Sequence, residues 1–217
     1  ALNPENLVKE ITTLFDMPHT LVCFTPSTKS ELTKKLKAVH KEAKVLAALP
    51  KQLHDFTPRQ PQGSSTVYLV NFEGATQVFL SHYGTNGEKY DINRVATRRL
   101  YNEYFGGSMN AIVFQEIREA RALAYSAFAV YRTPDRKEDP YNMYSYISTQ
   151  ADKLPDAVTA FNEILLNMPE SEKAFGIAQN GLLEQLRTRR YDGRSMPNLY
   201  FYLKDLGIDQ NPDALVY

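Results

Sequence analysis

Apolar residues recur at intervals of three and four along much of the chain, which is the spacing of an amphipathic helix. The clearest case lies within residues 30–47, where lysines fill the rest of the helix circumference. In the first predicted helix, Asn3 is the N-cap and Pro4 the first helical residue, and Gly207 is positioned to end the last one. We predict helices over residues 4–15, 30–47, 92–104, 108–119, 155–167, 171–190 and 197–206.

Shorter segments are either continuously apolar or alternate between apolar and polar residues, as β-strands do. The predicted strands are residues 19–24, 66–72, 76–83, 123–132 and 141–149. The turn Glu73-Gly74-Ala75 joins the second strand to the third, and a polar turn at 133–140 joins the last two. Strands connected by short turns pair in antiparallel fashion. The predicted fold class is therefore α+β, with a mainly antiparallel sheet covered by helices.

Residues 50–65 differ in composition from the rest of the chain, because they contain three prolines, a glycine and two serines. Such a stretch is typical of a linker or of a long crossing over the surface. A chain of 217 residues suits one large domain or two small ones. We predict a single domain over residues 1–217, with the segment near 50–65 as a surface crossing.

Charge and cysteine content narrow the possible functions. The 25 Lys and Arg residues balance the 25 Asp and Glu residues, so the chain lacks the basic excess of a dedicated nucleic-acid-binding protein. No apolar run approaches the roughly 18 residues of a membrane-spanning helix, and no membrane span is predicted. The single cysteine, Cys23, excludes an internal disulfide framework and a multi-cysteine metal site. Its place in an apolar segment predicts that it packs in the core.

The common catalytic and metal-binding motifs are missing. The four histidines form neither H-x-x-E-H nor H-E-x-x-H, so we expect no zinc in this chain and no catalysis by the chain on its own. Gly106-Gly107 lacks the Gly-Lys-Ser/Thr of a phosphate loop, and we interpret it as a turn that needs unusual backbone angles. The basic stretches within 30–47 and at 186–190 could bind an acidic partner, but solvated helix faces are the simpler interpretation.

The segment 101–131 carries a distinctive combination of residues. A predicted helix ends in a Gly-Gly turn, the next helix carries a Phe-Gln pair and then Arg-Glu, and a Leu-x-Tyr strand follows. The residues concerned are Gly106, Gly107, Phe114, Gln115, Arg118, Glu119, Leu123 and Tyr125. This combination resembles the signature of the pitrilysin or insulinase-type zinc metallopeptidases, which include the mitochondrial processing peptidases. One departure is Ala122, where the family usually has glycine.

The resemblance implies a division of roles between two homologous halves. In that family one half carries the inverted zinc motif H-x-x-E-H, and the other has lost it but contributes an arginine and a tyrosine seven residues apart. Arg118 and Tyr125 have this spacing, so the chain is similar to the non-catalytic, C-terminal-type half. The implied partners are a zinc-motif-bearing half, in the same polypeptide or in a separate subunit, and a peptide substrate. Zinc is expected on the partner half and no cofactor in this chain.

The chemistry of peptide hydrolysis explains the two residue types. Attack on a peptide carbonyl builds negative charge on its oxygen, to which a tyrosine hydroxyl can donate a hydrogen bond. A guanidinium offers permanently charged donors to substrate carbonyls or carboxylates. We therefore assign Arg118 and Tyr125 to substrate binding and assign no catalytic or metal-ligating residue in this chain.

Two alternatives remain open at this stage. One is a structural subunit that keeps the fold without a peptidase role, and the other is a free-standing peptide-binding module. The sequence assigns no compartment: a bacterial protein of this kind would be periplasmic or cytoplasmic.

Overall fold

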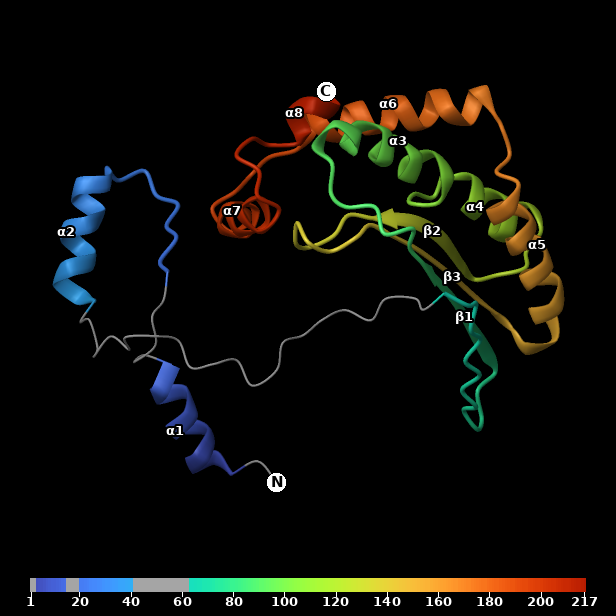
Figure 1. Cartoon of the computed structure of the whole chain (residues 1–217), viewed down its shortest axis with the longest axis horizontal. Coiled ribbons are helices and arrows are strands. Elements are labelled where there is room, and N and C mark those ends of the chain that lie inside the picture. The colour runs from blue at the N-terminus through green and yellow to red at the C-terminus, as the bar shows by residue number, and fades with distance from the viewer. Residues whose placement is uncertain (1–2, 15–19, 41–62) are drawn as a thin grey trace. The chain divides into compact units, whose positions relative to one another are not determined.

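The structure is a computed structural model that describes residues 3–14, 20–40 and 63–217. By its internal contacts the chain divides into two compact units, residues 1–58 with 191–199 and residues 59–190 with 200–217. The sheet and the helices that cover it belong to the second unit (Figure 1). Most of the proline-rich segment near 50–65 lies outside the described residues, and the single domain over all 217 residues stays a prediction.

Two of the predicted helices lie in the first unit. Helix α1 spans Pro4–Leu14 and helix α2 spans Lys29–Val39. A backbone amide two residues on donates to Asn3 Oδ1 at 2.9 Å, which is the cap predicted for α1. Thr28 begins α2 with a capping box, in which its hydroxyl and the carboxylate of the glutamate three residues on accept from each other's backbone amides. The part of the predicted helix over 41–47 lies outside the described residues.

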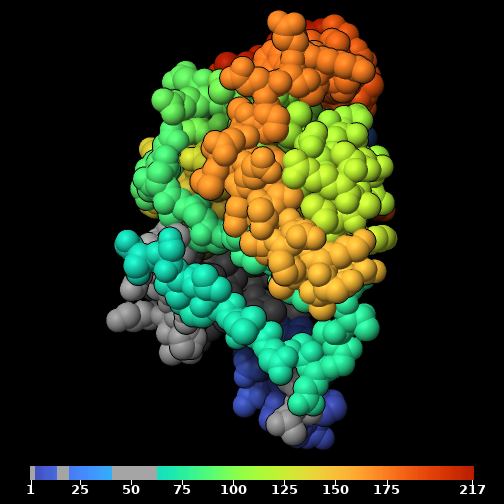
Figure 2. All heavy atoms as spheres, turned by 90° about the vertical axis from the view of Figure 1, so that its right-hand side faces the viewer, coloured from blue at the N-terminus to red at the C-terminus, as the bar shows by residue number. Residues whose placement is uncertain are grey.

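Two segments predicted as strands form no strand. Residues 20–24 and 66–72 pair with no neighbour, and His19 lies outside the described residues. Their apolar side chains are exposed, with Leu69 at 95% and Phe24 at 62%. Cys23 is exposed as well, so the prediction that it packs in the core is wrong. Residues 63–72 form a narrow cyan strip on the surface (Figure 2). A β-prone sequence becomes a strand only where another strand completes its hydrogen bonds.

The sheet has three strands in the described part of the chain: β1 (Gln77–Gly84), β2 (Ser126–Arg132) and β3 (Asn142–Gln150). Their order is β1-β3-β2, and both pairs are antiparallel. The hairpin of β2 and β3 agrees with the prediction, and the α+β fold class is confirmed. Because side chains alternate between the faces of a sheet, one face carries aromatic rings. On this face Phe128 and Phe79 lie on either side of Tyr146, with ring centroids 5.4 and 6.0 Å from it.

Helices cover the opposite face of the sheet. Helices α3 (Val95–Phe105) and α4 (Ile112–Phe114) pack against β2, and α5 (Leu154–Leu166) packs against β3 (Figure 1). Helix α6 (Glu172–Thr188) packs on α3. The predicted stop at Gly207 is present, with a φ of 68°. The other elements are the 3₁₀ turns η1 (Ile92–Arg94) and η3 (Ala151–Lys153), the π-helix η2 (Gln115–Ala120), α7 (Ser195–Asp205) and α8 (Asp213–Val216).

The hydrophobic core lies between the sheet and these helices. Ala129 of β2 and Ile147 of β3 are fully buried, as are Phe105, Ile117 and Phe161 from the helical layer. Burying each of the large side chains stabilises the fold by about 1.5–3 kcal/mol. Small residues on β2 let the helical layer approach the sheet closely. This close packing fixes the position of the segment that connects α4 to β2.

The Gly106-Gly107 turn ends α3 where that helix meets β2. A Cβ on Gly106 would lie 2.3 Å from the carbonyl oxygen of Ala129 and 2.6 Å from its nitrogen. Neither glycine has a positive φ, but Gly106, with a φ of −158° and a ψ of 8°, lies outside the helical and extended regions. The predicted unusual backbone angles are therefore present at Gly106. A side chain at Gly106 is excluded because the backbones of α3 and β2 approach too closely, whereas a Cβ on Gly107 would lie 2.8 Å from the carbonyl oxygen of Asn102 in α3 itself.

Candidate functional site

Arg118 and Tyr125 are held at the transition from helix to strand. Arg118 lies on the π-helix η2, a type of helical bulge that is frequent at functional sites. The Leu123 amide donates to the carbonyl of Ile117 at 3.0 Å, and the Tyr125 amide donates to the carbonyl of Ser148 on β3 at 2.8 Å. These two bonds fix the end of the helix and the start of the strand relative to the sheet.

Ala122 makes the sharp turn between these two bonds. Its φ is +49°, and it is the one residue other than glycine with a positive φ among the described residues. Only glycine adopts this region without a steric cost, so the position explains the glycine that the resembled family usually carries there. The departure noted in the sequence thus places an alanine in a conformation that favours glycine.

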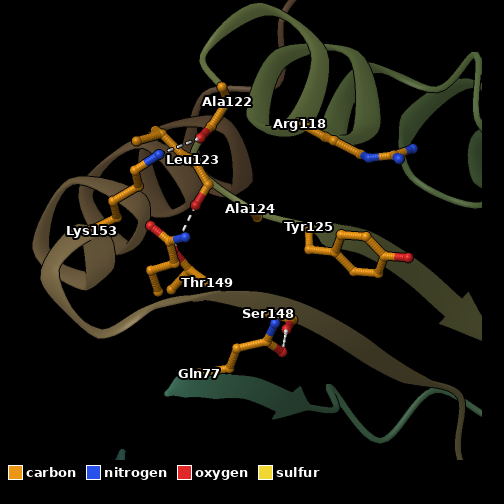
Figure 3. A pocket seen from close by; sticks show the side chains of 10 residues that line it. Gln77, Arg118, Ala122, Leu123, Ala124, Tyr125, Ser148, Thr149 and Lys153 are labelled. Atoms are coloured by element: carbon orange, nitrogen blue, oxygen red, sulfur yellow. Dashed lines mark hydrogen bonds between the residues drawn. The ribbon is translucent and has the colours of Figure 1, made fainter.

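The structure brings Arg118 and Tyr125 together. The guanidinium carbon of Arg118 lies 5.7 Å from the centroid of the Tyr125 ring and 4.7 Å from that of Phe114. Figure 3 shows the two side chains extending toward the same side, Arg118 from the helix and Tyr125 from the strand. Tyr125 is 76% exposed, and Arg118 forms one long ion pair, 3.5 Å from Glu119. Both polar ends are accessible to a ligand.

The signature residues beside Arg118 have structural roles. Phe114 supplies the aromatic face on which the guanidinium rests. The side-chain amide Nε2 of Gln115 donates to the carbonyl of Met109 at 2.7 Å, which ties the helix to the turn that precedes it. These contacts hold the helical segment that carries Arg118.

A pocket of about 290 Å³ adjoins the pair. It is lined by Gln77, Arg118, Ala122, Leu123, Ala124, Tyr125, Ser148, Thr149, Gln150 and Lys153. Three hydrogen bonds connect its walls: Ser148 Oγ to Gln77 Oε1 at 3.3 Å, Thr149 Oγ1 to the Leu123 carbonyl at 2.6 Å, and Lys153 Nζ to the Ala122 carbonyl at 3.3 Å (Figure 3).

The charge of this pocket is positive. Its lining includes two cations, Arg118 and Lys153, and no carboxylate. Sequence reasoning identified Arg118 and Tyr125 but not Lys153, because Lys153 reaches the site from the far end of β3 and shares no motif with them. The neutral and cationic side chains of the lining do not suit a zinc ion, which binds thiolate, imidazole or carboxylate ligands. No group of three such residues is close enough to hold a metal within the described ranges.

A second cluster of arginine and tyrosine lies in the same unit, and sequence reasoning missed it. Arg98 of α3 is 8% exposed, with its guanidinium carbon 3.6 Å from the centroid of the Tyr141 ring. It forms an ion pair with Glu88 at 2.6 Å, and the hydrogen bond from Arg98 holds the pKa of Glu88 below its usual value. Burial raises the pKa of Tyr141, and it raises the pKa of Tyr90, which stacks on Tyr141, to about 12. This cluster is enclosed and serves the fold.

A family model described as peptidase M16 inactive domain matches residues 21–182. The chain belongs to this family. It is thus a pitrilysin-type domain of the non-catalytic, C-terminal type, as the segment 101–131 suggested. Residues 21–182 include both Arg118 and Tyr125. None of the helices in the described ranges is long and apolar enough to cross a membrane.

Solved structures agree on the fold of this M16 inactive domain. The peptidase M16 inactive domain from Pseudomonas fluorescens is 18% identical, with a TM-score of 0.51, and the match covers 65% of this chain and 34% of that one. A protease from Helicobacter pylori is 13% identical, with a TM-score of 0.59, and the match covers 88% and 49%. The chain thus matches about a third to a half of the length of these structures. No curated protein sequence matches it.

Proposed function

We propose that this M16 inactive domain binds peptide substrate and completes the active site of a zinc-carrying partner half. The observation that carries the proposal is that the half-buried Arg118 and the exposed Tyr125 lie together. They converge from two elements on one accessible side, in the family whose signature they match. The family match supports a homologous partner half, which would supply the zinc, in the same polypeptide or as a separate subunit.

The two side chains have different roles in the proposed site. When the scissile carbonyl is attacked on the partner half, its oxygen becomes negative, and the Tyr125 hydroxyl donates a hydrogen bond to it. Among the described residues, no hydrogen bond engages this hydroxyl. The Arg118 guanidinium, resting on the Phe114 ring, directs its donors to a carbonyl of the peptide backbone. Orientation of the substrate is thus the task of Arg118, and stabilisation of the developing charge that of Tyr125.

The main alternative is a structural subunit with the same fold. A subunit of that kind has no need for an exposed tyrosine hydroxyl beside an exposed guanidinium. Around Arg98, where the arginine and the tyrosine serve packing, both side chains are buried. The exposure of the pair therefore favours substrate binding.

Turnover of a peptide by the enzyme assembled from this chain and its zinc-motif half tests the proposal. Tyr125→Phe removes only the hydroxyl, and we expect a loss of about 10²–10³-fold in kcat, the effect of removing one oxyanion donor. Arg118→Ala is expected to raise KM as well. Tyr83→Phe is the matched control, because Tyr83 is also exposed on the same unit and lies outside the pocket. Unchanged turnover in both Tyr125→Phe and Arg118→Ala, with assembly intact, would establish the structural subunit instead.

A further inference from the structure

The pocket beside the pair extends away from Arg118 and Tyr125 toward Lys153. In Figure 3 the two exposed side chains lie at one end, and Lys153 lies at the other, on the far side of the Leu123 and Ala124 backbone. When Arg118 and Tyr125 hold one residue of a peptide, an adjacent part of the same peptide therefore lies next to this pocket. A volume of about 290 Å³ is near the lower limit for ligand pockets and suffices for one side chain or one chain end.

Lys153 has unused capacity to bind. Its ammonium carries three donors, and one of them is directed at the Ala122 carbonyl at 3.3 Å. In the described part of the chain, no carboxylate lies within ion-pair distance of it. Lys153, a half-buried residue, therefore keeps two donors of its ammonium for a ligand.

The neutral side chains of the lining add donors. Gln77 uses its oxygen to accept from Ser148, which leaves its amide NH₂ as a donor. Thr149 already donates its hydroxyl to the Leu123 carbonyl. A positive, donor-rich pocket without carboxylates favours an anionic ligand with two acceptor oxygens.

We propose that the pocket between Lys153 and Gln77 is a subsite for a carboxylate of the bound peptide, and that it confers a preference for acidic peptides. This inference rests on the proposed function, because the pair must first hold the peptide beside the pocket. The carboxylate can come from an Asp or Glu side chain or from the C-terminus of the peptide. Both offer the same planar pair of oxygens.

Fluorescence anisotropy with three labelled peptides tests the preference. One peptide has a central Glu and an amidated C-terminus, the second has Gln in place of this Glu, and the third has Gln and a free C-terminal carboxylate. Binding is measured to the chain alone and to its complex with the zinc-motif half. We expect one or both carboxylate peptides to bind roughly fivefold more tightly than the neutral one, since a partly exposed charge pair contributes about 1 kcal/mol. The peptide that gains affinity identifies the source of the carboxylate.

Variants separate the subsite from the general effect of charge. Lys153→Gln is expected to abolish the preference, and Lys153→Arg to retain it. Lys173→Gln is the matched control, because it removes one positive charge from an exposed site on α6 that is outside the pocket. Equal affinity for all three peptides, or a preference that survives Lys153→Gln, would overturn the subsite.

A Tyr125→Ala variant distinguishes failure of the subsite from failure of the proposed function. If binding of every peptide falls in Tyr125→Ala but no charge preference exists, the pair binds peptide and the subsite is wrong. If neither the chain nor its complex binds any peptide, or if Tyr125→Ala leaves all affinities unchanged, both proposals are overturned. Lys153→Gln is checked by thermal unfolding, because it also removes a bond to the Ala122 carbonyl.

Discussion

The cluster around Arg98 and the pair of Arg118 and Tyr125 both combine arginine with tyrosine, but in different surroundings. Arg98 lies against Tyr141 at 3.6 Å, both are buried, and Glu88 balances the charge. Arg118 lies 5.7 Å from Tyr125, which is 76% exposed. The residue types alone thus do not reveal whether a cluster stabilises the fold or binds a ligand. The two clusters differ in burial and in the distance to the carboxylate, which is 2.6 Å from Arg98 to Glu88 and 3.5 Å from Arg118 to Glu119.

The physical reason lies in the cost of removing a charge from water. A guanidinium taken into the interior needs an anion and an aromatic face, and once it has both it is not available to a ligand. A guanidinium at the surface pays no such cost and contributes little to stability, but it remains able to bind. The Arg98 cluster therefore stabilises the fold, and the Arg118 pair is available to bind a ligand.

Removal of each arginine should give the largest contrast. Arg98→Ala is expected to lower the free energy of unfolding by about 2–3 kcal/mol, because it empties a packed site over the Tyr141 ring. Arg118→Ala should change it by less than about 0.5 kcal/mol, as exposed substitutions do. Urea unfolding followed by circular dichroism measures both. Similar losses in the two variants would mean that the clusters do not differ in role.

The spacing between α3 and β2 can be tested at Gly106. Gly106→Ala is expected to cost about 1–3 kcal/mol, since its Cβ would meet the Ala129 backbone and move the helix that carries Arg98. Gly176→Ala in α6 is the control, because this substitution is expected to increase the stability of the fold. No atom lies within 4 Å of that added methyl group, and alanine is preferred to glycine in a helix by roughly 0.5–1 kcal/mol. Thermal unfolding of the two variants measures both effects. A Gly106→Ala variant that is more stable than the unsubstituted chain would contradict the close approach of α3 to β2.

The turn at Ala122 should give the smallest effect. Ala122→Gly relieves a left-handed alanine but makes the unfolded chain more flexible, so we expect a net gain of about 0.5 kcal/mol. Ala120→Gly, two residues earlier at the end of the π-helix, lacks the positive φ and should be destabilising. A loss of stability in Ala122→Gly would show that the turn is not strained. Peptide binding by this variant should be unchanged if the turn keeps its geometry.

Local patterns predicted much of the second unit correctly. The helices over 155–167 and 171–190 and the hairpin of β2 and β3 lie close to the predicted bounds, because each combines a clear period with a turn or a cap. The same reasoning from local patterns also predicted strands over 19–24 and 66–72, and these two predictions were wrong. An alternating apolar segment is a strand only if a neighbouring strand and a covering layer exist, and neither can be found by inspecting the segment.

The candidate site shows the same limit. The seven-residue spacing of Arg118 and Tyr125 spans one helix end and one strand start, so a single motif contains both. Gln77 begins β1 and Lys153 lies on η3, so both are remote in sequence from the motif, and nothing in their neighbours marks them. Arg98 was overlooked because its partners, Glu88 and Tyr141, lie on other elements.

The sequence by itself determined the fold class, the family resemblance and the pair Arg118 and Tyr125, since all three depend on periodicity or on residues within one short segment. The tertiary structure alone decided which arginine is buried, why Gly106 must lack a side chain and which groups surround the pocket. These properties depend on how closely segments distant in sequence approach. That distance follows from the packing of the whole core, to which every buried side chain contributes.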